Sequence, residues 1–331
     1  MKTEYMSGSL LKKAFIGAAN LLEKNKEMIN ALNVFPVPDG DTGTNMSLTM
    51  QSAIRQLDNL KHDDIEDIAN TVSNGSLLGA RGNSGVILSQ LLRGFSNGLK
   101  KSKDINTKAV ALAFKEGAET AYKAVMKPIE GTILTVAREC GEKAIEIAKN
   151  GNDLVSFLEE LIKHGEVALN KTPEMLPVLK EAGVVDAGGK GLIVLLQGAL
   201  LSLKGEDDYI SNNEDVSQSI EIDFQQLVKT DEDIKFGYCT EFLINNNNNN
   251  NSKNFAKDIG NLGDSMMVID GDGFIKVHIH TNNPGTVLQK ALEVGELLDI
   301  KIDNMRYQSS NTEDDIIELK KYGFITVSMG E

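Results

Sequence analysis

Apolar residues recur every three to four positions through most of residues 1–205, which places them on one face of an α-helix. Leu88, Leu91, Leu92 and Phe95 are one example of this spacing. The pattern predicts helices at residues 10–30, 46–57, 65–76, 86–99, 107–125, 133–149, 153–168 and 192–204. The first part of the chain is therefore expected to be an all-α helical barrel or bundle.

The hydrophobic pattern changes after a polar, acidic stretch at residues 206–219. Beyond this stretch, short apolar runs predict strands at 237–244, 266–270, 274–281 and 297–302 and a helix at 284–294. We therefore expect an all-helical domain at 1–205, a linker at 206–219 and an α/β middle domain at 220–322. The fresh apolar run at 323–331 indicates the first strand of a third, truncated domain.

Two segments between the predicted elements differ in character. Residues 245–251 are consecutive asparagines, a low-complexity run that is expected to form an exposed loop. Glycine-rich connections occur at 39–43, 79–85, 130–132 and 186–191. Because glycine allows the backbone to approach a ligand closely, such loops at one end of a bundle suit a phosphate site.

The charge balance narrows the choice of ligands. The chain has 34 Lys plus Arg against 48 Asp plus Glu, a formal net charge of -14. This charge repels nucleic acid and anionic membrane surfaces, so neither is an expected partner. A protein this acidic that binds a polyanion must offset the repulsion locally with cations, helix N-termini or backbone amides.

Cysteine usage and the N-terminus indicate the compartment. Cys140 and Cys239 are the only cysteines, so the sequence predicts no disulfide framework and a reducing environment. Charged residues interrupt the N-terminus too early for a secretory signal, and no segment has membrane-spanning length. The sequence therefore predicts a cytoplasmic protein.

The motif Asp39-Gly40-Asp41-Thr42-Gly43-Thr44-Asn45 combines two carboxylates with an expected helix start near Thr44. Carboxylate oxygens in a glycine-rich turn suit Mg²⁺, and the first amides of a helix suit the phosphates that Mg²⁺ bridges. A turn with ordinary capping residues explains the same motif equally well. An EF-hand does not, because Thr44 and Met50 occupy the positions that require Gly and Glu.

The segment Gly79–Gly85 leads into an expected helix, so its amides and the Ser84 hydroxyl are candidates for binding phosphate. Close helix packing explains its glycines nearly as often. No strand precedes this segment, which disfavours a dinucleotide-binding fold. The segment Gly188–Gly191 lacks the spacing and the Ser or Thr of a P-loop.

Cys239 lies on one predicted strand, and His278 and His280 lie on another. Residues two apart on a strand point to the same face, so both imidazoles are expected to converge. The set is compatible with a catalytic Zn²⁺ that keeps an open position. A histidine here also suits a general base or a transient phosphate carrier, and ordinary structural roles remain an alternative for all three residues.

Four segments in order resemble the motifs of the dihydroxyacetone-kinase nucleotide-binding domain family. They are 39–46, 82–85, 128–134 and 185–189. The combination is most similar to the catalytic subunit of bacterial fatty acid kinases, whose domains run nucleotide-binding, middle and C-terminal. The resemblance extends over essentially the whole chain.

The resemblance implies a helical barrel that binds ATP at one end, with Mg²⁺ between carboxylates and phosphates. Asp39 and Asp41 are then metal ligands, and Asn33 stands near the position of a third aspartate in the family pattern. The implied nucleotide-binding residues are Thr42, Gly43, Thr44, Asn45, Asn83, Ser84, Gly85, Gly131, Thr132, Asp186 and Gly188.

The resemblance also implies a reaction, in which the γ-phosphoryl group of ATP passes to a fatty acid carboxylate presented by a fatty-acid-binding protein. Cys239, His278 and His280 would be the catalytic residues of the middle domain. We further expect a homodimer. Two alternatives stay open at this point: a kinase that acts on dihydroxyacetone or a similar triose, and a nucleotide-binding regulatory module without turnover.

Overall fold

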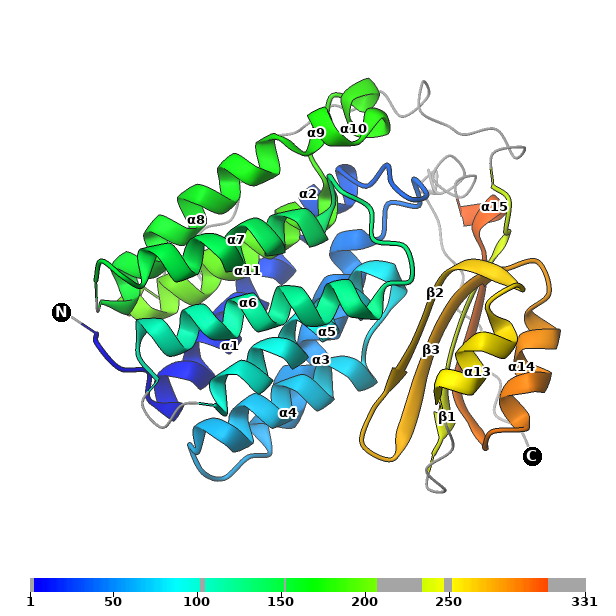
Figure 1. Ribbon diagram of the computed structural model, residues 1–331, viewed down its shortest axis with the longest axis horizontal. Helices are drawn as coiled ribbons and strands as arrows, with labels where there is room; N and C mark the ends of the chain where they lie inside the picture. The colour runs from blue at the N-terminus through cyan, green and yellow to red at the C-terminus, as the bar shows by residue number, and fades with distance from the viewer. Residues whose placement is uncertain (1–2, 102–104, 152, 207–233, 247–251, 309–331) are drawn as a thin grey trace, which may run out of the picture.

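The computed structural model describes residues 3–101, 105–151, 153–206, 234–246 and 252–308. A bundle of helices forms the part before residue 207, and a sheet with helices on one face forms the part after residue 233. The two parts lie side by side (Figure 1). The expected fold class, an all-α domain followed by an α/β domain, is confirmed.

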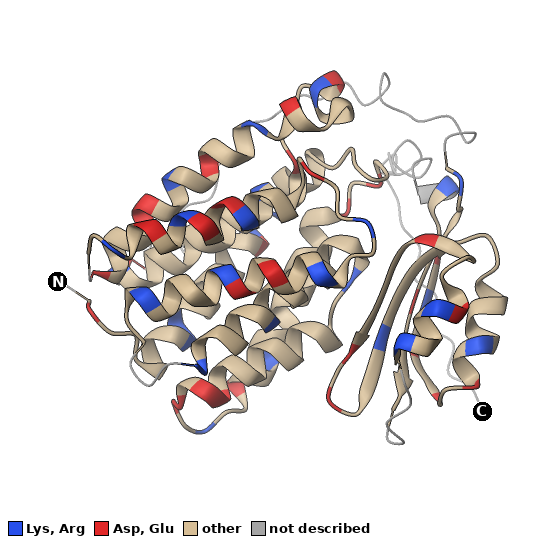
Figure 2. Ribbon diagram, viewed as in Figure 1, with Lys and Arg blue, Asp and Glu red and all other residues tan. Residues whose placement is uncertain are grey.

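The bundle is built from long helices, with short ones beside the loops that connect them. In chain order its helices are α1 (Gly8–Lys24), α2 (Lys26–Ala31), α3 (Thr42–Asp58), α4 (Ile65–Leu78), α5 (Gly82–Leu99), α6 (Thr107–Ala124), α7 (Ile133–Ile147), α8 (Leu154–Asn170), α9 (Thr172–Met175), α10 (Pro177–Ala182) and α11 (Ala187–Lys204). Acidic and basic positions are interspersed along α6 and α7 (Figure 2).

The interior of the bundle is apolar, and small residues allow its helices to approach closely. Leu22, Ile29 and Met46 belong to one cluster of buried side chains, and Leu57 and Leu161 to another. Where α1 meets α11, a Cβ atom added at Gly198 would overlap the carbonyl oxygen of Gly17. These contacts hold α1 and α11 together along their middle turns.

The second part contains β1 (Tyr238–Asn245), α13 (Ser252–Ile259), β2 (Gly263–Asp270), β3 (Phe274–Thr281), α14 (Pro284–Leu292), β4 (Leu297–Asn304) and α15 (Met305–Gln308). The strand order is β2-β3-β1-β4, and every neighbouring pair is antiparallel. Because strand residues alternate between faces, each strand contributes to two different environments.

One face of the sheet packs on α13 and α14, and the other faces the helical bundle. Val277 and Ile279 belong to the cluster that includes Phe255 of α13 and Val287 of α14. On the other face, Phe274 clusters with apolar residues of α4 and α5, while polar residues follow it along β3. This face of the sheet is therefore apolar at the Phe274 end of β3 and polar further along the strand.

The structure corrects several expected boundaries. The helix expected at 10–30 is two helices, because Asn25 leaves the helical path and donates from Nδ2 to the carbonyl of Leu21 at 2.8 Å. The helices α9 and α10 were not predicted. Both are short, with Pro173 and Pro177 in their first turns, where the missing proline N–H costs nothing.

Several glycines assigned to loops lie in helices. Gly188, Gly189 and Gly191 belong to the first turns of α11, and α5 begins at Gly82 rather than at Val86. A Cβ atom at Gly191 would lie 2.6 Å from the sulfur of Met46, so a larger residue there would have to displace the end of that side chain. The helix starts expected at 46, 86 and 192 were therefore four or five residues late.

Some predictions fall on residues that the structure leaves undescribed. They are most of the linker at 206–219, the asparagines at 247–251 and the third-domain strand at 323–331. Of the helices in the described ranges, none combines the length and the apolar composition needed to cross a bilayer.

Candidate active site between the helical bundle and the sheet

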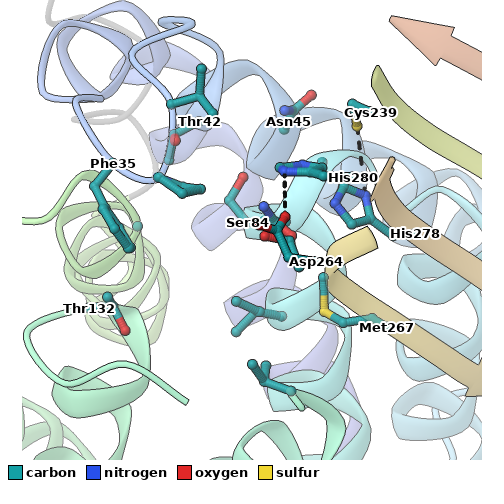
Figure 3. Close-up of a pocket in the computed structure, with 18 of the residues that line it drawn as sticks. Phe35, Thr42, Asn45, Ser84, Thr132, Cys239, Asp264, Met267, His278 and His280 are labelled. Carbon is teal, nitrogen blue, oxygen red and sulfur yellow. Dashed lines mark hydrogen bonds and ion pairs between the residues drawn. The ribbon is translucent and has the colours of Figure 1, made fainter. Parts of the chain in front are cut away.

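A cavity of about 410 Å³ lies where the helical bundle meets the sheet. Its walls come from segments far apart in sequence: the loop before α3, the start of α5, the loop before α7, the start of α11 and the polar face of β1, β3 and β4. Figure 3 shows Phe35 and Thr132 on one side and Cys239, His278 and His280 on the other. Two expected sites, one for nucleotide and one in the middle domain, therefore share one cavity.

Asp39 and Asp41 line this cavity together, as their two-residue spacing suggested. Burial and the neighbouring Asp41 carboxylate raise the pKa of Asp39 to about 8. Burial also raises the pKa of Asp41, although a hydrogen bond from Asn45 and the charge of Lys301 oppose this rise. Two carboxyl groups that are costly to ionise side by side favour a cation between them.

Asn33 is buried beside these carboxylates, but its contact differs from the expected one. Its Nδ2 donates a hydrogen bond to Oδ1 of Asp39 at 2.5 Å. In this arrangement the amide nitrogen, not the oxygen, faces the carboxylate. In this structure Asn33 is therefore a hydrogen-bond partner of Asp39, and its expected part in holding the metal stays a prediction.

The start of α5 forms a second wall. Asn83 and Ser84 line the cavity and are partly exposed in the first turn of the helix. Amides in a first helical turn lack intrahelical partners and favour anions. Thr42 and Asn45, from the first turn of α3, line the cavity as well. These positions suit a phosphate chain.

The loop before α7 and the start of α11 form a third wall, with Thr132 and Gly188 in the lining. Asp186 caps α11 by accepting a hydrogen bond from the Gly189 amide at 2.7 Å. Burial raises the pKa of Asp186 to about 6 despite the backbone hydrogen bonds to its carboxylate. This carboxyl therefore acts first as a helix cap at the edge of the cavity.

Four expected nucleotide-binding residues are absent from the cavity lining. Added Cβ atoms would overlap the Lys26 carbonyl at Gly43 and the Thr49 hydroxyl at Gly85, so both glycines serve packing. Thr44 exchanges two hydrogen bonds with Asn30, at 3.0 and 3.1 Å. Gly131 adopts a φ of 83° in the turn before α7.

The sheet contributes the predicted Cys239, His278 and His280, which converge as expected. One ligand atom from each lies within 4.8 Å of the other two, and the two imidazole centroids are 5.1 Å apart. Burial raises the pKa of the Cys239 thiol, and burial with the charge of His278 lowers the pKa of His280 to about 3. The donor set fits a soft cation that binds thiolate and neutral imidazole.

Three further residues on this face were not identified from the sequence. Glu241 stands opposite His278 on β3 and Lys301 on β4, and Asp303 stands opposite Cys239. Lys301 donates to Asp303 at 2.7 Å. The spacing of Cys239 and Glu241 already places them on one face, but only the strand register brings Lys301 and Asp303 beside them.

Comparison with known families gives two matches. Residues 36–201 match the sequence model of the family described as "DAK2 domain". Residues 235–312 match the family described as the middle domain of fatty acid kinase A-like subunits. The first match spans the helical half and the second the sheet, so the cavity lies between the two matched regions.

Relatives and a solved structure were also found. Protein YloV of Bacillus subtilis is 43% identical over 354 residues, covering 100% of this chain and 63% of its own length. An uncharacterized protein of Staphylococcus aureus is 43% identical over 339 residues, covering 98% of this chain and 62% of its own. The chain therefore spans less than two thirds of these relatives.

The dihydroxyacetone kinase from C. freundii, solved with AMP-PNP and Mg²⁺, is a weak structural neighbour. Its TM-score is 0.45 at 14% identity, over 59% of this chain and 34% of that one.

Proposed function

Because the chain belongs to the DAK2-domain family and carries a middle domain of the fatty acid kinase type, we propose that it is the nucleotide-binding subunit of an ATP-dependent kinase. One observation carries the proposal: a single cavity is lined by the Asp39 and Asp41 carboxylates and by the Cys239, His278 and His280 cluster. The carboxylates that would hold the metal thus lie in the same cavity as the side chains suited to phosphoryl transfer.

In this proposal Asp39 and Asp41 hold Mg²⁺, which would neutralise charge on the phosphates. Asn33 keeps Asp39 oriented through its hydrogen bond. The first turns of α3 and α5 offer amides, and Thr42, Asn45, Asn83 and Ser84 offer side chains, to the phosphate chain. Thr132, Asp186 and Gly188 line the remainder of the nucleotide site.

The acceptor that we propose is a fatty acid carboxylate. One carboxylate oxygen forms a bond to the γ-phosphorus while the bond from that phosphorus to the bridging oxygen breaks, giving an acyl phosphate and ADP. The ionised carboxylate has no proton to lose, so the site must mainly align two anions and screen their repulsion. Lys301 lies on the sheet face and lines the cavity, so its charge suits this task.

Cys239, His278 and His280 face the acceptor side in this proposal. Their donor set suits Zn²⁺ with one open position, and zinc there would polarise an oxygen of the acceptor. Without zinc, an imidazole of the pair would contact the transferred group directly. Elemental analysis of the purified chain separates these two forms of the proposal.

Three further proposals rest on the family rather than on the cavity. A fatty-acid-binding partner would present the acyl chain, since a free acyl chain is poorly soluble in water. The protein would act as a homodimer and in the cytoplasm. Each of these proposals concerns a full-length protein, and this chain covers 63% and 62% of the length of the two relatives.

The test is a calorimetric titration with ATP, with and without Mg²⁺, on the wild type and on Asp41→Asn. We expect micromolar, Mg²⁺-dependent binding that Asp41→Asn weakens at least tenfold, or about 1.4 kcal/mol. Asp58→Asn, at the exposed far end of α3, is the matched control and should bind like the wild type.

Mg²⁺-independent binding, or unchanged affinity in Asp41→Asn, would remove these carboxylates from the site. Acceptor assays then separate the rival functions. Phosphorylation that dihydroxyacetone inhibits competitively would favour a triose kinase, and tight ADP binding without phosphate transfer to any acceptor would favour a regulatory module.

A further inference from the structure

Glu241 lies at the centre of the polar sheet face and touches both halves of the molecule. Its side chain is only 2% exposed, although it is a carboxylate. The Oε1 atom lies 2.7 Å from Nδ1 of His278 on β3 and 2.6 Å from the amide nitrogen of Gly82, where α5 begins. One buried oxygen therefore joins a histidine of the sheet to the loop that leads into α5.

Nδ1 of His278 lies 2.7 Å from Oε1 of Glu241 and 3.9 Å from Sγ of Cys239, and the shorter contact determines which ring nitrogen carries the proton. An ionised carboxylate only accepts hydrogen bonds, so the neutral imidazole must be protonated on Nδ1. Its Nε2 then holds a lone pair, and this atom is buried without a hydrogen-bond partner among the described residues. A buried acceptor of this kind is free to bind a metal ion or a transferred group.

A lysine lies beside Glu241 on each neighbouring strand. Lys301 stands opposite it on β4, and Lys276 lies two residues before His278 on β3. Lys276 is buried on the same face, and its Nζ also lacks a hydrogen-bond partner within the described ranges. Lys276 therefore lies near Glu241 within one face of the sheet, not across the interface from it.

The contact with Gly82 ties this histidine to the proposed phosphate wall. Gly82 has a φ of 58°, so its amide points out of the ordinary helical path towards the sheet. Beside it, Arg81 pairs with Asp299 of β4 at 3.2 Å, and Arg93 donates to the carbonyl of Asp270 at 2.6 Å. Among these cross-interface contacts, only that of Glu241 also reaches His278.

We propose that Glu241 is a positioning residue of the phosphoryl-transfer site, holding His278 in the tautomer with a free Nε2 and fixing the sheet against the start of α5. The proposal rests on the proposed function, because a positioning role for Glu241 presupposes phosphoryl transfer at this site. Its central claim concerns the tautomer of His278, which can be measured without nucleotide or acceptor. Failure of the kinase proposal and failure of this one are thus distinguishable.

The experiment is a long-range ¹H–¹⁵N correlation NMR spectrum of the full chain with labelled histidine. The chain has 4 histidines, and His278→Gln identifies the resonance of interest. In the wild type we expect protonated Nδ1 and unprotonated Nε2 for His278. In Glu241→Ala, and to a smaller extent in Glu241→Gln, the tautomer protonated on Nε2 should become measurable.

Asp299→Asn is the matched control, because it removes a carboxylate from the same interface without touching His278. It should leave the tautomer as in the wild type. With an active acceptor system, Glu241→Ala should lower kcat by about 10- to 100-fold, the usual effect of losing a carboxylate behind a functional histidine.

Two results would overturn the proposal. One is a wild-type His278 that carries its proton on Nε2. The other is an unchanged tautomer in a folded Glu241→Ala or Glu241→Gln protein. If Glu241→Ala fails to fold, the wild-type spectrum and the Glu241→Gln variant still decide the question.

Discussion

Replacing Gly82 by alanine tests whether the geometry at the start of α5 supports nucleotide binding. Gly82 has a φ of 58°, in the region that residues with a Cβ rarely adopt. An added Cβ would lie 3.1 Å from Cγ of Asn45 and would overlap its Nδ2. Asn45 lines the cavity and hydrogen-bonds to Asp41, so the substitution must displace a contact of the proposed metal site.

The expected effect of Gly82→Ala has two parts, a loss of stability and a loss of nucleotide affinity. The left-handed backbone costs roughly 1–2 kcal/mol for any residue with a Cβ, and the overlap adds the displacement of Asn45. Gly183 provides a matched control, since its φ is 68° but nothing lies within 4 Å of an added Cβ. Both alanine variants should lose about 1–2 kcal/mol of stability, and only Gly82→Ala should lose affinity for Mg²⁺-ATP, by roughly tenfold.

Thermal unfolding and calorimetry measure the two parts. Each variant should unfold roughly 2–8 °C below the wild type, as expected from about 2–4 °C per kcal/mol for chains of roughly 150–250 residues. ATP affinity should fall in Gly82→Ala and stay within about twofold of the wild type in Gly183→Ala. Wild-type affinity in Gly82→Ala would refute the role that we give to the start of α5 and to Asn45.

Two further predictions concern charge in the cavity. Asp39 has a pKa raised to about 8, and in the proposed site it would bind Mg²⁺ only when ionised. Mg²⁺-ATP binding at pH 7 should therefore release about one proton and tighten as the pH rises towards 8. Calorimetry in buffers of different ionisation enthalpy measures the release, and no release would contradict the prediction. Lys301→Met should raise the KM for the anionic substrates about tenfold, and Lys301→Arg should restore it. The exposed control Lys257→Met should have no effect. An unchanged KM in Lys301→Met would show that Lys301 does not contact the substrates.

The local pattern of hydrophobic residues was enough to predict most of the long helices and the strands. The three-to-four spacing identified the long helices, because helical periodicity reports which face of a helix is buried whatever covers it. Alternation placed Cys239, His278 and His280 on one face of a sheet, and the structure brings them together. The family resemblance, read from four short motifs, is confirmed by the matches to both domains.

Helix starts were less predictable where glycine is frequent. At Gly188 and Gly191 the sequence resembles a loop, yet both residues lie in α11. Glycine lowers helix propensity, but the close approach of Met46 to Gly191 compensates for this through packing that no local pattern contains. The same reason accounts for Gly43 and Gly85, which pack closely against Lys26 and Thr49; their expected part in phosphate binding stays a prediction.

The sequence by itself thus determined the two kinds of domain, the paired carboxylates and the cysteine-histidine face. Only the tertiary structure decided that these features share one cavity and that Glu241 links His278 to Gly82, which lies 159 positions before Glu241 in the chain. Strand register places Lys301 and Asp303 beside Glu241 and Cys239. The physical reason is that hydrophobic periodicity specifies which face is buried, whereas docking and register depend on contacts between distant segments.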